Sequence, residues 1–302
     1  MSRGTLFRLA LLAILWGSGF LFVTVALRSL SPVQLTLARL SLGAAVLVPF
    51  VILRDRGLPR GRRVWAHLAV AALLANVLPY LLFAFAQEEL ASGLAGSINA
   101  TTPLWALAFE IAAGARRIGP ARLAGLAVGF AGTFLIFAPW ESGAGVATWP
   151  AITALVASAS YGLSYVYQHR FLVGRGDAPM SLAAGQLAAA TGLLCLAVPV
   201  AGLQPIHLRT DAVLALVVLG TLGTGVAYVI NFRLIADQGP AASIVSYLIP
   251  VVALILGVLV LRERLILRTI GGVAVVLAGV AVATATPSLA PRRKEGTGEA
   301  RP

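Results

Sequence analysis

The chain has 302 residues, of which 59% are apolar and 11% are charged, and its mean hydropathy is +0.92. Soluble domains carry about 25% charged residues, so this composition excludes an ordinary soluble enzyme and indicates an integral membrane protein. The net charge of +12 would indicate nucleic-acid binding in a soluble protein. Here the basic residues lie mostly between apolar runs, where they orient a membrane protein, and no nucleic-acid partner is expected.

Ten apolar segments approach the length of about 20 residues that a helix needs to cross a bilayer. In chain order they are 6–27, 33–53, 66–87, 91–113, 119–139, 149–172, 181–202, 212–234, 241–261 and 266–285. The runs are continuous and do not alternate, which predicts helices and argues against a β-barrel. The sequence therefore predicts an all-α integral membrane protein with ten transmembrane helices, followed by a disordered tail at 286–302.

The positions of arginine and lysine predict the orientation. With the N-terminus inside, 17 of the 23 basic residues fall on cytoplasmic segments and five on outer segments. This bias predicts a multi-pass protein of the cell (plasma or inner) membrane with both termini in the cytoplasm. The outer loop 262–268 departs from the bias because it carries three arginines.

The two halves of the chain resemble each other at fixed offsets. A shift of 147 residues places Pro32 on Pro179, Pro103 on Pro250, Gly125 on Gly272 and Gly132 on Gly279. Shifts of 145 to 148 place Trp16 on Tyr161 and Tyr80 on Tyr228. Each half has five spans, an odd number, so the halves are expected to have opposite orientations in the membrane. This pattern predicts two inverted five-helix repeats, 6–139 and 149–285, as in alternating-access transporters.

Several motifs in this frame match a known family. The first span contains Ile14-Leu15-Trp16-Gly17-Ser18-Gly19-Phe20, the second has Pro32 followed by Ala38-Arg39-Leu40, and the ninth ends in Leu261-Arg262-Glu263-Arg264-Leu265. With these motifs the chain resembles, over roughly 6–285, the ten-helix EamA-type transporters of the drug/metabolite transporter superfamily. The resemblance implies transport of small metabolites without nucleotide hydrolysis. The first half departs from the family pattern because Arg116 matches Glu263 and the acidic residue comes earlier, at Glu110.

Polar and aromatic side chains occupy one face of several predicted spans. Such groups are costly at membrane depth and tend to face a pathway or a partner. The candidates for substrate binding combine ring surface with hydrogen-bonding groups near the midplane: Trp16, Asn76, Tyr80, Asn99, Tyr161, Tyr165 and Tyr228. The alternative is that these residues bond neighbouring helices or anchor the spans at the interfaces.

Charged residues and prolines within the spans supply further candidates. Arg39 could bind an anionic substrate or extend toward the interface while holding helix carbonyls. Glu110 and His169 are the candidates for carrying a coupling proton. Pro103 and Pro250 fall midway along predicted helices, where a missing backbone donor predicts either a gating bend or a static kink.

Glycines recur on the fifth and tenth predicted spans and are typical of close helix packing. They are Gly125, Gly129, Gly132, Gly271, Gly272 and Gly279. The two stripes could pack against each other or against a second copy of the chain. Because ten spans supply both halves of a transporter, a monomer is expected, with a dimer as the alternative.

The function predicted from these features is gradient-driven secondary transport, with export favoured over import. The polar faces suit small amphipathic solutes such as amino acids or related compounds. The chain lacks the spacing of a zinc protease and the phosphate-binding loop of an ATPase, so no enzyme activity, cofactor or metal is expected. The alternative functions are a channel or, more remotely, an intramembrane enzyme.

Overall fold

The computed structural model describes residues 3–53, 57–114, 119–137, 149–201, 204–206, 209–263 and 267–285, and the predicted tail at 286–302 lies outside them. All regular secondary structure in the described part is helical. Within the described residues, five helical segments are long and apolar enough to cross a membrane: Arg3–Ala26, Pro32–Leu53, Arg62–Ala86, Pro179–Val198 and Thr210–Gln238. Shorter apolar helices lie between them in the sequence and after them. The all-α class and its membrane character are thus confirmed.

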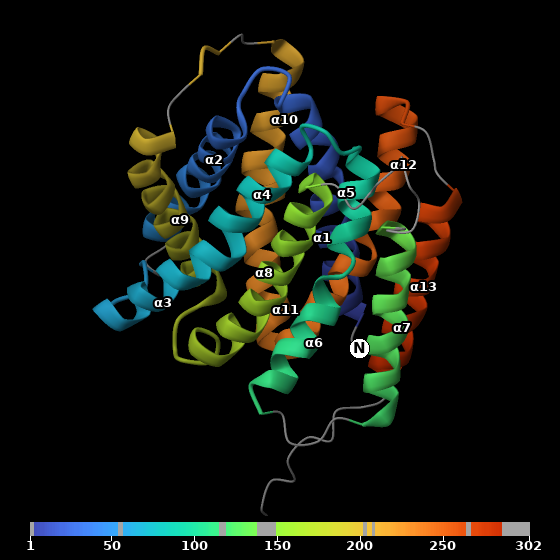
Figure 1. The fold of residues 1–302 in the computed structure, drawn as a ribbon. Coiled ribbons are helices and arrows are strands. Elements are labelled where there is room, and N and C mark those ends of the chain that lie inside the picture. The colour runs from blue at the N-terminus through green and yellow to red at the C-terminus, as the bar shows by residue number, and fades with distance from the viewer. Residues whose placement is uncertain are drawn as a thin grey trace, which may run out of the picture.

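The helical elements pack into a bundle, in which some consecutive elements continue one long helical segment (Figure 1). They are α1 (Arg3–Ala26), α2 (Pro32–Leu53), α3 (Arg62–Ala72), η1 (Leu73–Val77), α4 (Leu78–Ala86), α5 (Ser92–Asn99), α6 (Thr102–Ala112), α7 (Pro120–Phe137), α8 (Trp149–Phe171), α9 (Pro179–Ala201), α10 (Thr210–Gly220), η2 (Thr221–Val226), α11 (Ala227–Gln238), η3 (Gly239–Tyr247), α12 (Ile249–Leu261) and α13 (Leu267–Ala285).

Two π-helical turns interrupt long helices at related places. The turn η1 separates α3 from α4, and η2 separates α10 from α11; their first residues, Leu73 and Thr221, are 148 positions apart. Side chains bond to carbonyls within η1, because the Ser160 hydroxyl donates to Leu74 O (2.7 Å) and the Tyr228 hydroxyl donates to Ala75 O (2.6 Å). Such π turns are frequent at functional sites because they redirect the side chains that follow.

The two mid-span prolines lie in the first turn of a helix, directly after a break in the helical run. The helix α5 ends at Asn99, and Pro103 is the second residue of α6; η3 ends at Tyr247, and Pro250 is the second residue of α12. Proline lacks a backbone donor, which costs nothing in the first turn of a helix, whereas inside a continuous helix its ring would clash with the carbonyl four residues earlier. Each proline therefore marks a helix restart.

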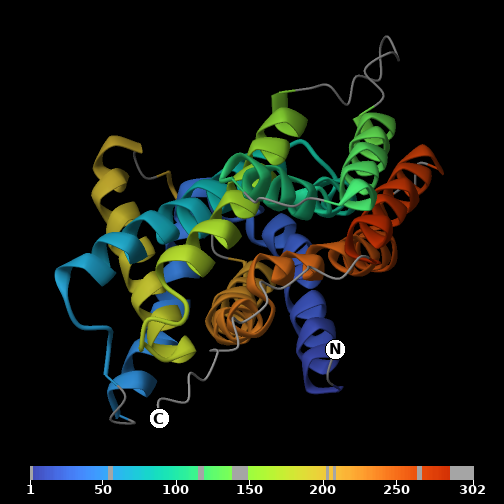
Figure 2. The ribbon, with the colours of Figure 1, turned by 90° about the horizontal axis from the view of Figure 1, so that it is seen from below.

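The helices α7 and α13 stand together at one edge of the molecule (Figures 1 and 2). Their glycines face each other so closely that a Cβ on Gly132 would lie 2.6 Å from the backbone nitrogen of Val276. A Cβ on Gly279 would likewise meet the backbone of Gly129. The two glycine stripes therefore pack against each other within one chain, which decides between the two alternatives left by the sequence.

The centre of the molecule is built around Trp16, which packs against three of the hydrophobic clusters. One cluster lies mainly among α5, α8 and α12, a second among α2, α3 and α9, and a third between α1 and α11. Tyr161 on α8 contacts the first two. The aromatic residues at this junction border an internal cavity.

Candidate functional site

A narrow cavity lies where the helices of both halves converge. It offers about 50 Å³ to the centres of water molecules, and one water needs roughly 10–15 Å³ on this measure, so it holds a few waters. Its lining residues come from α1, α2, α4, α5, α8, α11 and η3: Trp16, Gly19, Phe20, Val23, Arg39, Tyr80, Phe83, Gln87, Asn99, Tyr161, Tyr165, Tyr228 and Ser246.

Six of the seven candidates for substrate binding line this one cavity; they are Trp16, Tyr80, Asn99, Tyr161, Tyr165 and Tyr228. The seventh, Asn76, is not among the lining residues. It is fully buried, and its Oδ1 accepts a hydrogen bond from Gln186 Nε2 on α9 at 2.7 Å. Because Asn76 belongs to the π turn η1, its side chain bonds α9 instead of bordering the cavity.

The aromatic side chains around the cavity support one another. Trp16 meets Tyr228 edge to face with ring centroids 6.1 Å apart, and Phe83 stacks on Tyr161 at the same centroid distance. Phe20 packs edge to face on Phe83 at 5.3 Å. Such pairs add roughly 0.5–1.5 kcal/mol beyond the surface that they bury. The rings therefore form a rigid apolar wall.

Arg39 reaches the cavity from α2. Its Nε donates a hydrogen bond to Thr224 Oγ1 at 2.7 Å, and the guanidinium carbon lies 3.6 Å from the centroid of the Tyr80 ring. Close packing makes this possible, because a Cβ on Gly220 would lie 2.6 Å from Leu42 Cβ on α2. The side chain is 8% exposed. Arg39 therefore lies against the cavity. The alternative from sequence, in which its side chain extends toward the membrane interface, does not hold.

Glu110 and His169 lie together in a second, more open pocket of about 470 Å³. It is formed by the ends of α6 and α8 and the start of η3, and Arg170 and Pro240 also border it. This pocket and the central cavity have no lining residue in common. The structure thus brings the two coupling candidates together but separates them from Arg39.

Glu263 makes a contact that the sequence did not predict. Its two carboxylate oxygens accept hydrogen bonds from the backbone nitrogens of Ser92 (2.7 Å) and Gly93 (3.0 Å), the first two residues of α5. A carboxylate at a helix N-terminus satisfies backbone donors and the helix dipole. The preceding Arg262 adopts a left-handed conformation (φ 58°) that ends α12. Family resemblance drew attention to Glu263, but its partners lie about 170 residues earlier in the chain.

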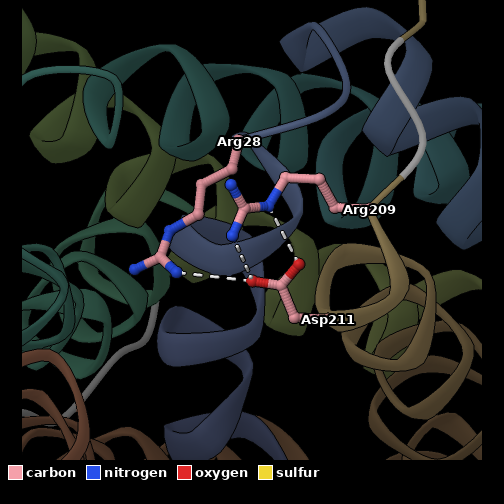
Figure 3. A network of polar contacts seen from close by, with 3 residues as sticks. All are labelled: Arg28, Arg209 and Asp211. Atoms are coloured by element: carbon pink, nitrogen blue, oxygen red, sulfur yellow. Dashed lines mark hydrogen bonds and ion pairs between the residues drawn. The ribbon is translucent and has the colours of Figure 1, made fainter.

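Ion pairs connect α1 to the α10–α11 segment at both ends of the molecule. At one end Asp211 contacts Arg28 (3.5 Å) and Arg209 (3.1 Å), as Figure 3 shows. The hydrogen bond with Asp211 raises the pKa of Arg209. At the other end Arg8 and Asp237 are 2.9 Å apart. Exposed pairs of this kind contribute little to stability, so the cavity depends chiefly on helix packing.

Comparison with known proteins places this architecture. The EamA-like transporter family matches residues 4–138 and, separately, residues 148–285. The chain belongs to this family. It is therefore a multi-pass membrane transporter of the drug/metabolite transporter superfamily, and its substrates are small molecules.

Relatives of this EamA-family chain are themselves described as transporters. It is 28% identical over 252 residues to the uncharacterized inner membrane transporter YedA of Escherichia coli, covering 82% of this chain and 79% of YedA. An uncharacterized transporter of Archaeoglobus fulgidus is 25% identical over 94% of this chain and 99% of its own. A solved crystal structure shares the fold with a TM-score of 0.69 and 21% identity, covering 94% of this chain and 98% of that one.

Proposed function

We propose that this protein is a secondary active transporter that moves small amphipathic metabolites, such as amino acids, by alternating access. Export is the favoured direction, and a gradient supplies the energy. The observation that carries the proposal is the central cavity, which is lined by aromatic and polar residues from both halves of the chain. Midplane sites between related halves are typical of secondary transporters.

The halves 6–139 and 149–285 are proposed to be inverted five-helix repeats, which together give ten transmembrane spans. The π turns of the two halves begin 148 residues apart, and both halves restart a helix before the matched prolines Pro103 and Pro250. The contacts between helices are also related by the repeat. The third span packs on the sixth through α4 and α8, and the first span packs on the eighth through α1, α10 and α11. The pairs α2–α9, α5–α12 and α7–α13 each join equivalent spans.

The lining of the cavity supports a pseudo-twofold axis through it. At offsets of 145 to 148 residues, lining residues of one half correspond to lining residues of the other: Trp16 to Tyr161, Phe20 to Tyr165, Tyr80 to Tyr228 and Asn99 to Ser246. Small rocking motions of the halves would open such a site to one side at a time.

The coupling ion is proposed to be a proton carried at the pocket that contains Glu110 and His169. The pocket brings together a histidine and a carboxylate, two side-chain types that carry protons in many proteins. Transport in vesicles should then collapse when a protonophore removes the pH gradient and should not require sodium. Uptake that depends on sodium and ignores the protonophore would assign the coupling to sodium.

Both termini are proposed to be cytoplasmic, in a protein that works as a monomer in the plasma (inner) membrane. Within the chain the glycine stripes of α7 and α13 already cover each other, which supports the monomer. Single cysteines at Arg60 and Glu89, both exposed, test the orientation in a cysteine-free background. A membrane-impermeant reagent applied to intact cells should label position 89 and not position 60; the reverse pattern would invert the topology.

Counterflow in proteoliposomes tests the transport mechanism. Vesicles preloaded with unlabelled L-leucine should accelerate and overshoot the uptake of radiolabelled L-leucine, and the initial rate should saturate with concentration. A carrier must return its binding site to the outer side after each uptake step, and internal solute speeds this return. Uptake of labelled solute is therefore coupled to exit of unlabelled solute. A rate that rises linearly and ignores the internal solute would indicate a channel.

A further inference from the structure

We infer that the central cavity recognises its solute through a carboxylate that pairs with Arg39, so that its substrates are small organic carboxylates with an apolar body. This inference rests on the proposed transport function and specifies the substrate class. Amphiphiles whose only charge is positive should bind poorly at the same site.

The charge balance of the cavity is the first reason. Arg39 lines it, and none of the lining residues in the described part of the chain is an aspartate or a glutamate. Within the described part of the chain, Arg39 donates one hydrogen bond, from Nε to the neutral Thr224 hydroxyl, and forms no ion pair. The Tyr80 ring at 3.6 Å compensates the charge only in part. A buried cation without a counter-ion is costly, and an anionic guest would supply that counter-ion.

The second reason comes from the equivalent position in the other half. A shift of 147 residues places Arg39 on Gln186, and a shift of 148 places Asn76 on Thr224. Gln186 Nε2 donates to Asn76 Oδ1 at 2.7 Å, the same distance as the Arg39–Thr224 bond. The contact between spans is thus made equally well by a neutral amide pair.

The comparison of these two pairs separates a structural role from a functional one. Gln186 and Asn76 share one hydrogen bond and are not among the residues that line the cavity, whereas Arg39 is. Packing at this position does not require a positive charge. The charge of Arg39 is therefore available to bind a solute in the cavity. The planar guanidinium retains two terminal nitrogens, which can hold both oxygens of one carboxylate.

The remaining lining defines the rest of the solute. Rings of Trp16, Phe20 and Phe83 offer an apolar surface, and Asn99 and the Tyr165 hydroxyl offer hydrogen bonds. The Tyr165 hydroxyl is buried and bonds to no other described residue. With a single cation, the site suits one carboxylate on a compact apolar body and not a polyanion.

Three compounds with related branched chains test the inference by calorimetric titration of the purified full-length protein. L-leucine carries both charged groups, 4-methylpentanoate only the carboxylate, and 3-methylbutylamine only the amine. We expect the first two to bind and the amine to bind about tenfold more weakly or not at all. Equal binding of the amine and the carboxylate, or no binding of either carboxylate at millimolar concentration, would overturn the inference.

Variants assign the effect to Arg39. Arg39→Gln reproduces the residue already present at the equivalent position, so the fold should tolerate it, and it should lower the affinity for 4-methylpentanoate about tenfold or more. Arg62→Gln removes the same charge from an exposed position at the start of α3 and should leave the affinity unchanged. Unchanged affinity in Arg39→Gln would refute the role of Arg39.

The titrations and the counterflow assay test separate claims, so one can give a negative result without the other. Carboxylate binding that depends on Arg39, without counterflow, would keep the recognition and reject the transport mechanism. Saturable counterflow of 3-methylbutylamine that is unaffected by Arg39→Gln would keep the transporter and reject carboxylate recognition.

Discussion

Glu263 allows a sharp test of how the two halves are held together. Glu263→Gln keeps one oxygen that can accept the hydrogen bond from Ser92 N (2.7 Å), but the new amide NH₂ cannot accept from Gly93 N (3.0 Å). The change removes one charge-assisted hydrogen bond, each of which contributes about 1.5–3 kcal/mol, and weakens the interaction with the helix dipole by about 0.3–1 kcal/mol. We expect the free energy of unfolding to fall by about 2 kcal/mol.

Equilibrium unfolding of the purified protein in detergent, followed by tryptophan fluorescence, measures this loss. Glu89→Gln is the matched control, because it removes the same charge from an exposed residue just before α5. The control should change the stability by less than about 0.5 kcal/mol, as is usual for surface substitutions. Equal destabilisation by both variants would show that general charge, and not the cap on α5, accounts for the effect.

Two further predictions concern the cavity and the α7–α13 pair. Tyr161→Ala should reduce solute affinity about 5- to 150-fold at unchanged protein level, whereas Phe134→Ala, whose ring is 61% exposed, should not; equal activity losses that follow protein level would show that Tyr161 serves folding. Gly132→Ala should lower the unfolding midpoint because its Cβ would lie 2.6 Å from a backbone nitrogen. Gly192→Ala, with open space around it, should hold or raise the midpoint; a fall of the same size in both would contradict the close packing.

Local patterns in the sequence were sufficient for much of this description. Hydropathy predicted an all-α membrane protein because a bilayer requires long apolar helices whose backbone bonds are internal. The 3.6-residue period placed Tyr80, Tyr161 and Tyr228 on polar faces, and all three line one cavity. Matched prolines at a fixed offset located the equivalent breaks, although the period alone did not show that the helices restart there.

Partners distant in the sequence were decided only by the tertiary structure. Periodicity tells which face of a helix a residue occupies, but not which helix packs against that face. Asn76 and Tyr80 were both predicted to lie at the cavity, yet the π turn and the proximity of Gln186 divert Asn76. The sequence alone allowed the Arg39 side chain to extend toward an interface. The close approach of α2 and α10 instead places it beside Thr224. These contacts join segments more than 100 residues apart, and only the packing of the helices brings them together.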